Sequence, residues 1–334
     1  MKKVIGVVLC LVLAIGLLAS CAGKTPAPSG GGSSSTPSLI KVGIVNLEPS
    51  ESGYREANVK DMAAVFTEAN GYQAFNSNVP TVDAQIAAAK QFITEGVSYL
   101  LISAADPAGW DDVLKQAKTA GIKVFLFDRM IDADASLYES AVVSNMANQG
   151  DTAVAWLKAQ NLSEYNVIHI QGQVTSDASQ GRTAALQKEF DAGTMNLVQR
   201  GTGGDSWSSD EAKKIVEGVI SSGADFNVIY AENDGMAEGA MKALDEAGIS
   251  HGVGGKVIIM GFDCNKFALR YVMEGKWNYD GQCSPFQASV IDQMIKGTKA
   301  VEKKIISEEK GFDAEGKGAT KVTQEVIDKY GLGE

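Results

Sequence analysis

The chain has 334 residues, of which 45% are hydrophobic, 21% charged and 7% aromatic. This length is typical of two domains rather than one, and the composition is that of a globular α/β protein. The 30 Lys and Arg residues against 41 Asp and Glu give a net charge of −11, which argues against a nucleic-acid partner because no excess of basic side chains can neutralise phosphates. The 2 histidines and 4 cysteines are too few for a His-rich metal site or a zinc ribbon.

The first 20 residues have the organisation of a secretory signal peptide. Lys2 and Lys3 precede an apolar segment over residues 4–19, which is shorter than the roughly 18–20 residues that a membrane-spanning helix needs. Small residues follow, and Leu18-Ala-Ser-Cys21 resembles the lipobox of bacterial lipoproteins. This resemblance implies that Cys21 receives a diacylglyceryl group and becomes the mature N-terminus. The alternative is a plain signal peptide in which the cysteine is incidental.

The next segment favours the lipoprotein. Residues 22–38 contain no apolar side chain larger than alanine, and glycine, serine, threonine and proline dominate them. Such a segment cannot bury enough surface to fold, so we predict a lipidated cysteine and a flexible linker over residues 21–38. Two or more acyl chains suffice for stable anchoring. We therefore expect a folded body in the cell envelope, held at the outer face of the cytoplasmic membrane or in the periplasm.

Beyond residue 38 the sequence alternates between predicted strands and helices. Six runs of apolar or β-branched residues are nearly continuous, as is typical of parallel strands covered on both faces. They span residues 40–47, 98–103, 122–128, 166–170, 226–231 and 256–263. Between them, apolar residues recur at helical spacing, for example from Val82 to Ile93 and from Val113 to Ala117. The alternation predicts an α/β fold with parallel sheets.

Two parts of the chain resemble each other and suggest two similar lobes. Lys118-Thr-Ala-Gly-Ile precedes a predicted strand that ends in Phe127-Asp128. In the same way, Asp245-Glu-Ala-Gly-Ile precedes one that ends in Phe262-Asp263. A single aspartate at such a place could simply cap the following helix. Because ligands bind outside the carboxyl ends of parallel strands, a matched pair instead predicts a cleft lined by polar groups from both lobes.

Seven short motifs occur in sequence at the expected strand ends. They are Ser50-Glu-Ser-Gly-Tyr-Arg55, Ala108-Gly-Trp110, Asp128-Arg129, the spacing from Gly172 to Arg182, Asn233-Asp234, Asp263 and Gln282. Together they resemble the type I periplasmic (solute-binding) proteins of sugar ABC transporters, and most closely the galactofuranose-binding branch of the ribose-binding-like group. Two departures, Tyr54 in place of a tryptophan and Gln282 in place of a glutamate, fall at positions that affect which sugar binds.

This resemblance implies two Rossmann-like lobes with parallel sheets, joined by a hinge that the chain crosses three times. We expect an N-terminal lobe of residues 39–143 and 283–302, and a C-terminal lobe of residues 144–282 and 303–334. The crossings are accordingly expected near Val143–Ser144, near Gln282–Cys283 and after about residue 302.

The resemblance also implies a site for a neutral monosaccharide of the galactofuranose, ribose, galactose or arabinose type. Arginine donates from a rigid fork, carboxylates accept strongly, and aromatic rings form the walls. The residues expected to bind the sugar are Glu51, Ser52, Tyr54, Arg55, Trp110, Asp128, Arg129, Arg182, Trp207, Asn233, Asp234, Asp263 and Gln282. The three arginines and three aspartates in this set nearly balance in charge, which suits an uncharged ligand.

The implied function is capture of the sugar by lobe closure and delivery to an ABC permease, by a monomer without cofactor or metal. No catalytic residue is predicted, because no nucleophile stands in a recognisable relation to a histidine. Two alternatives remain open: a tethered sensor that reports sugar occupancy to a chemoreceptor or kinase, and a sugar-modifying enzyme. Cys264 and Cys283 are expected near the hinge, either as a disulfide or as buried free thiols.

Overall fold

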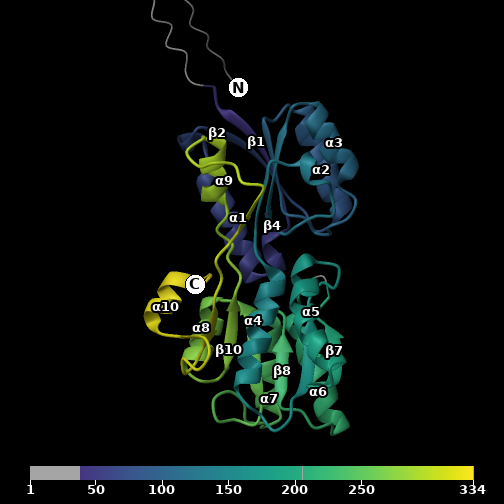
Figure 1. Ribbon diagram of the computed structural model, residues 1–334, viewed down its shortest axis with the longest axis vertical. Helices are drawn as coiled ribbons and strands as arrows, with labels where there is room; N and C mark the ends of the chain where they lie inside the picture. The colour runs from purple at the N-terminus through teal and green to yellow at the C-terminus, as the bar shows by residue number, and fades with distance from the viewer. Residues whose placement is uncertain (1–37, 205, 334) are drawn as a thin grey trace, which may run out of the picture. The chain divides into compact units, whose positions relative to one another are not determined.

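The computed structural model of the protein describes residues 38–204 and 206–333. The predicted signal peptide, the predicted lipidation site at Cys21 and most of the predicted linker lie outside these residues. Within the described part of the chain, no helix combines the length and the apolar character that crossing a membrane requires. The described residues form two α/β lobes, each built on one sheet, which Figure 1 shows with their helices.

The N-terminal lobe is built on a six-stranded sheet in which every neighbouring pair is parallel. The order is β11-β5-β4-β3-β1-β2. The strands are β1 (Ile40–Asn46), β2 (Tyr72–Asn78), β3 (Tyr99–Ile102), β4 (Lys123–Asp128), β5 (Ser140–Val143) and β11 (Lys304–Ile306). Helices α1 (Gly53–Val65) and α9 (Ala288–Ile295) cover one face, and α2 (Val82–Thr94) and α3 (Asp111–Thr119) cover the other (Figure 1).

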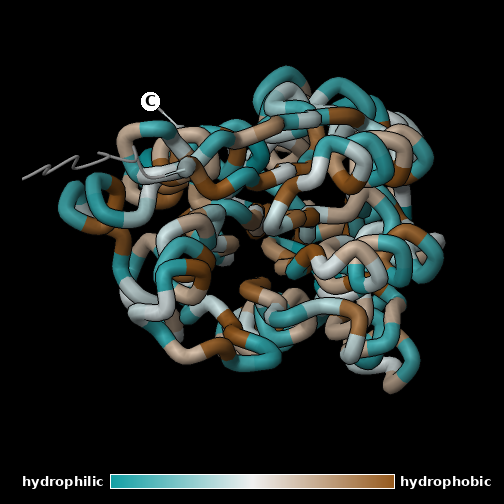
Figure 2. The backbone as a smooth tube through the Cα atoms, turned by 90° about the horizontal axis from the view of Figure 1, so that it is seen from above, coloured by the Kyte–Doolittle hydropathy of each residue, from teal (hydrophilic) through white to brown (hydrophobic). Residues whose placement is uncertain are grey.

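Successive side chains of each strand point to opposite faces of the sheet, which produces these two layers. In β4, Val124 and Leu126 pack in the cluster that contains α2 and α3, whereas Phe125 and Phe127 pack in the cluster that contains α1 and α9. Both faces are apolar because both are covered. Figure 2 shows hydrophobic segments of the backbone interspersed with hydrophilic ones.

The C-terminal lobe is built on a seven-stranded sheet in the order β13-β12-β10-β9-β8-β6-β7, parallel except between β10 and β12. Its strands are β6 (Asn166–Gln171), β7 (Asn196–Thr202), β8 (Val228–Ala231), β9 (Ile258–Asp263), β10 (Tyr279–Gln282), β12 (Gly311–Asp313) and β13 (Thr320–Lys321). Its helices are α4 (Met146–Ala159), α5 (Asp177–Asp191), α6 (Ser209–Ser222), α7 (Asp234–Glu246), α8 (Lys266–Met273) and α10 (Gln324–Tyr330). One core cluster joins the sheet to α4 and α5, and another joins it to α6, α7, α8 and α10.

The predicted class, two parallel-sheet lobes, is confirmed, and the six predicted strands coincide with β1, β3, β4, β6, β8 and β9. Strands β2 and β7 were missed because each lies at the edge of its sheet. An edge strand is covered on fewer sides, so its sequence is more polar; YQAFNSN and NLVQRGT are accordingly half-buried or exposed along most of their length.

The chain passes between the two sheets three times. The first crossing joins β5 to α4 around Ser144, and the second joins β10 to α9 through Cys283 and Ser284. We expected the third crossing after about residue 302. Strand β11 still pairs with β5, for example Ile305 with Val142, so the chain crosses only over residues 307–310. A strand of three residues is too short to recognise from sequence alone.

Candidate functional site

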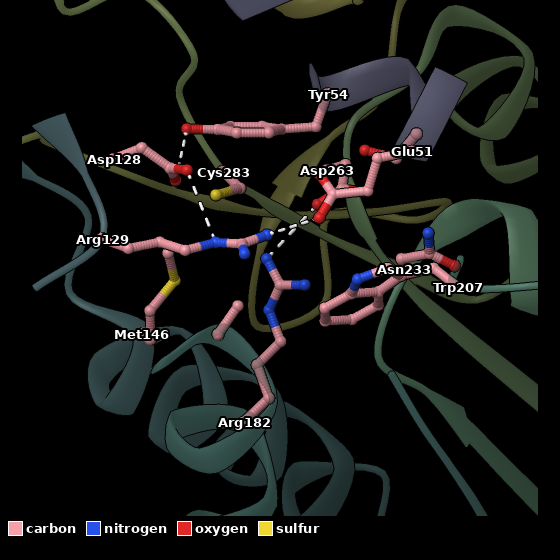
Figure 3. A pocket seen from close by; sticks show the side chains of 12 residues that line it. Glu51, Tyr54, Asp128, Arg129, Met146, Arg182, Trp207, Asn233, Asp263 and Cys283 are labelled. Carbon is pink, nitrogen blue, oxygen red and sulfur yellow. Dashed lines mark hydrogen bonds and ion pairs between the residues drawn. The ribbon is translucent and has the colours of Figure 1, made fainter. Parts of the chain in front are cut away.

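A cavity lies where the carboxyl ends of strands from both sheets face each other. Its empty volume, including the part open to solvent, is about 290 Å³. It is lined by Glu51, Ser52, Tyr54, Asp128, Arg129, Met146, Ala178, Arg182, Trp207, Asn233, Asp263 and Cys283 (Figure 3). Nine of the thirteen residues predicted to bind a sugar are in this lining.

Asp128 ends β4 and anchors the N-terminal side of the cavity. Its φ of 66° is in the left-handed region that non-glycine residues rarely adopt, and such strain is concentrated at functional sites. Tyr54 Oη donates to Asp128 Oδ1 at 2.8 Å, and Arg55 Nη2 donates to Oδ2 at 2.6 Å. Burial raises the pKa of Asp128, but the guanidinium groups of Arg55 and Arg129 outweigh it and hold the pKa below its ordinary value. The carboxylate is therefore ionised and fixed in orientation.

Arg129 follows Asp128 and reaches across the cavity in Figure 3. Its Nη2 donates to Glu51 Oε1 at 3.0 Å, and its Nε lies 3.5 Å from Asp128 Oδ2. Its Nη1 is buried without a hydrogen-bond partner among the described residues. Burial raises the pKa of Glu51, whereas Arg129 and Arg55 together hold it below its ordinary value. This side of the cavity thus holds charged groups in fixed positions, while Nε and Nη1 of Arg129 lack hydrogen-bond partners among the described residues.

Asp263 ends β9 and is the counterpart of Asp128 in the C-terminal lobe. It too has a positive φ, 112°. Arg182, on α5, donates from Nη2 to Asp263 Oδ1 at 3.3 Å and from Nε to Gln149 Oε1 at 2.9 Å. Its Nη1 donates to the carbonyl of Glu232. Burial raises the pKa of Asp263 to about 7, and Arg182 offsets that effect only in part.

Trp207 forms an aromatic wall of the cavity, on the segment before α6. Its φ is 51°, and a Cβ placed on Gly172 would lie 2.0 Å from its Cζ3 atom. The indole therefore lies directly on the backbone of Gly172, which only glycine allows. The indole Nε1 is buried and has no partner within the described chain. Asn233 lies at the N-cap of α7, where its Oδ1 accepts from the amide of Met236 at 2.8 Å.

Two predicted residues of the N-terminal lobe lie outside the lining. Arg55 is fully buried behind Asp128, and its donors are used by Glu51, Asn46, Asn58, Ser103 and Asp128. It orients the site rather than facing a ligand. Trp110 is also fully buried, because its ring packs in the core cluster with α2 and α3 while its Nε1 donates to the carbonyl of Asp106 at 3.0 Å. The prediction that Trp110 faces the ligand is therefore wrong for this arrangement.

Two predicted residues of the C-terminal lobe are likewise outside the lining. Asp234 Oδ2 accepts from the backbone and side-chain nitrogens of Asn265 at 2.8 and 3.0 Å. Burial, reinforced by the nearby Asp280 carboxyl, raises the pKa of Asp234 well above its ordinary value. Gln282 lines a separate cavity of about 200 Å³ together with Gln149 and Glu309. Successive residues of an extended segment point to opposite sides, so Cys283 lies in the main cavity instead.

Three lining residues were not predicted: Met146, Ala178 and Cys283. They carry no polar signal, and only their places, at the start of α4, near the start of α5 and after β10, connect them to strand ends. Within residues 38–204 and 206–333, Cys264 and Cys283 are buried free thiols, so of the two alternatives the structure contains the free pair. That same part of the chain has no cluster of three or more His, Cys, Asp or Glu residues able to hold a metal ion.

Comparisons with known proteins agree with this geometry. The family model described as a periplasmic binding protein domain matches residues 42–296. The fructose import binding protein FruE of Bifidobacterium longum (strain NCC 2705) is 30% identical over 316 residues, which cover 90% of this chain and 94% of that protein. A crystal structure of a galactofuranose binding protein is 27% identical, with a TM-score of 0.76 over 87% of this chain and 98% of the other.

A third similar protein is the periplasmic binding component of the arabinose ABC transporter from Shewanella sp. ANA-3, whose structure holds α- and β-L-arabinofuranose. It is 26% identical, with a TM-score of 0.74, and the match covers 83% of this chain and 93% of that one. The resemblance found in the sequence motifs is thereby confirmed. The chain belongs to the periplasmic binding protein family, as a type I sugar-binding member of the ribose and galactofuranose branch.

Proposed function

We propose that this protein captures a neutral monosaccharide in the cavity between its lobes and delivers it to an ABC permease. The observation that carries the proposal is the convergence of fixed charged groups from both lobes, with Asp128 and Arg129 on one side and Arg182 and Asp263 on the other. Two arginines and three carboxylates line the cavity, and Arg55 lies directly behind Asp128. The charges nearly cancel, which supports an uncharged ligand over a phosphate or a carboxylate.

The hydrogen-bonding capacity left in the cavity matches sugar hydroxyls. Arg129 Nη1 and Trp207 Nε1 are donors that no described residue uses, and a hydroxyl oxygen can accept from them. The carboxylates of Asp128 and Asp263 can accept from hydroxyl groups in return. A buried polar group without a partner costs roughly 1–3 kcal/mol, so a ligand that satisfies these donors gains affinity. The similar proteins are named as binding proteins of import systems, which supports binding rather than catalysis.

Lobe closure is the proposed mechanism of capture. The Met130 amide of the N-terminal lobe donates to Asp177 Oδ2 of the C-terminal lobe at 3.2 Å. At another contact between the lobes, a Cβ on Gly53 would lie 2.0 Å from Asn265 Oδ1, so α1 begins directly against the C-terminal lobe. A sugar that contacts both lobes favours this closed arrangement over an open one, because it gains its second set of contacts only on closure.

The direct test is calorimetry with the purified chain and the sugars named for the similar proteins: galactofuranose, arabinose and fructose, together with ribose and galactose. Ligand retained through native purification and identified by mass spectrometry gives independent identification. We expect saturable binding of at least one neutral sugar. We expect no binding of a sugar phosphate, because the cavity has no excess of cationic side chains to balance the phosphate charge. Absence of binding by every neutral sugar contradicts the proposal.

We further propose that the body is tethered through a lipid on Cys21, because the lipobox-like Leu18-Ala-Ser-Cys21 precedes a linker without large apolar side chains. The test is expression of the full chain and of Cys21→Ala in a bacterial host, followed by separation of membranes. The wild-type chain is expected in the membrane fraction and to incorporate labelled fatty acid, whereas Cys21→Ala is expected to incorporate none and to keep the apolar segment over residues 4–19. Equal labelling of the two proteins, or no labelling of the wild type, contradicts the anchor.

A further inference from the structure

Glu309 lies in the third crossing between the lobes, and its carboxylate contacts both of the other crossings. Its Oε1 accepts from Ser144 Oγ at 2.5 Å and from the backbone nitrogen of Ser284 at 3.0 Å. Ser144 belongs to the first crossing and Ser284 to the second. A single side chain therefore ties together the three segments about which the lobes turn, although it lies outside the lining of the main cavity.

The second carboxylate oxygen of Glu309 leads into the binding cavity. Its Oε2 accepts from Gln149 Nε2 at 2.7 Å. The other end of that amide, Gln149 Oε1, accepts from Arg182 Nε at 2.9 Å, and Arg182 lines the cavity. Gln149 and Arg182 are 4% and 2% exposed, so water competes little for these bonds, and hydrogen bonds in such surroundings are stronger than at the surface.

The donor and acceptor of each hydrogen bond in the series Arg182–Gln149–Glu309 are fixed by the groups involved. A guanidinium group can only donate, so the Gln149 carbonyl must face Arg182, and the amide nitrogen must then face position 309. The side chain at position 309 must therefore accept at that point. A donor there would either oppose the nitrogen of Gln149 or turn the amide over, which would bring its nitrogen against the Arg182 Nε–H.

We propose that Glu309 is a positioning residue for sugar binding: it orients the Gln149 amide and, through it, the Arg182 guanidinium, while it holds the three crossings together. The role rests on the proposed function, because Arg182 is the one of these three hydrogen-bonded residues that lines the proposed sugar cavity. It couples the arrangement of the hinge to the geometry of one binding residue. When the hinge shifts, the Glu309 carboxylate that accepts from Gln149 moves with it. Gln149 then turns, and Arg182 Nε loses the oxygen to which it donates.

The first test is Glu309→Gln, which has nearly the same shape. The amide oxygen can keep the bonds to Ser144 and Ser284, but the amide nitrogen takes the place of the oxygen that accepted from Gln149. We expect sugar affinity, measured by calorimetry, to fall about tenfold to a hundredfold, the effect of losing one hydrogen bond to a charged group. The matched control is Glu308→Gln on the exposed neighbouring residue, which changes the same charge and is expected to bind like the wild type.

The second test reverses the order of donors and acceptors. In the double variant Gln149→Glu with Glu309→Gln, the carboxylate introduced at position 149 accepts from both Arg182 and the amide at position 309. The net charge is the same as in the wild type, and we expect affinity to return toward the wild-type value. A merely structural role for Glu309 gives no such rescue. Gln149→Met leaves the ties between the crossings intact and is expected to lose affinity as Glu309→Gln does. Wild-type affinity in a folded Gln149→Met overturns the positioning role even if Glu309→Gln does not fold.

Circular dichroism and thermal unfolding of every variant separate loss of binding from loss of fold. Wild-type affinity in a folded Glu309→Gln, or a folded double variant that binds no better than the single one, overturns the positioning role while the proposed function stands. If the wild-type chain itself binds none of the neutral sugars, both the function and this role are overturned.

Discussion

The ends of β4 and β9 occupy corresponding places in the two lobes, but their aspartates lie in opposite electrostatic environments. Asp128 contacts Arg55 and Arg129, and its pKa is held below the ordinary value. Asp263 contacts Arg182, and burial raises its pKa to about 7. Both side chains are buried to a similar extent. The charged groups around a buried carboxyl, and not its depth alone, therefore decide its protonation state.

This contrast divides the site into two parts with different properties. On the N-terminal side, the lowered pKa values of Glu51 and Asp128 keep both carboxylates ionised near neutral pH. The C-terminal side contains Asp263 and, next to it on the following strand, Asp280, whose pKa burial raises to about 8. The raised pKa values bring the protonation of Asp263 and Asp280 into the pH range over which the variants below are compared. Substitutions on the two sides of the cavity therefore test this contrast.

Asp128→Asn is expected to have the largest effect. It removes the charge that compensates the buried Arg55, and an amide cannot accept from Tyr54, Arg55 and Ser103 as the carboxylate does. Removal of one partner of a buried ion pair typically costs about 3–5 kcal/mol. We expect the free energy of unfolding, measured in denaturant, to fall by that amount at every pH between 5 and 8. A loss that appears only at one end of this range contradicts the assignment of Asp128 as permanently ionised.

Arg182→Ala is expected to reduce sugar affinity about a hundredfold, because it removes charge-assisted bonds on the C-terminal side. It also removes the guanidinium that contacts Asp263, so the pKa of Asp263 is expected to rise further. Calorimetry measures the first effect, and NMR titration of the carboxyl group measures the second. Circular dichroism should show an intact fold. Wild-type affinity in the folded variant refutes the place of Arg182 in the site.

Asp263→Asn tests the pH dependence. The pKa of Asp263 is about 7 in the folded protein against an ordinary value of 3.8, so the folded state binds this proton more tightly than the unfolded chain. Its contribution to stability is complete at low pH and is lost as pH rises toward 7. The amide imitates the protonated group. We therefore expect the loss of unfolding free energy between pH 5 and pH 8 to be about 1–3 kcal/mol smaller in the variant, which is measured as a smaller fall in Tm. An unchanged slope contradicts the raised pKa.

The smallest effect on binding is expected for Trp110→Phe. The ring lies in the core of the N-terminal lobe, so the substitution is expected to lower stability by about 1–3 kcal/mol and leave sugar affinity unchanged. Trp207→Phe, in the wall of the cavity, is the matched variant and is expected to weaken binding because it removes the indole Nε1. Calorimetry on both distinguishes the two tryptophans, and a larger loss of affinity from Trp110→Phe would reverse their roles.

The sequence predicted the parts of the site that depend on strand ends and failed where side-chain direction matters. Asp128 and Asp263 were found because the matched Phe-Asp pairs mark the carboxyl ends of two strands. Cys283 was missed in favour of Gln282 because the choice between adjacent residues depends on which face of the extended segment points inward. Trp110 follows a loop in the sequence as a ligand-binding ring would, and only packing shows that it turns into the core.

The thiol of Cys283 is a natural chemical probe for the proposed opening of the lobes. The thiol is 3% exposed and lies in the wall of the cavity, and burial raises its pKa, so the reactive thiolate is scarce while the lobes are together. On the proposed opening of the lobes this sulfur becomes exposed, so we expect its alkylation rate to report the openings without any attached dye. Cys264, fully buried in the C-terminal core, reacts only on unfolding and provides the internal reference.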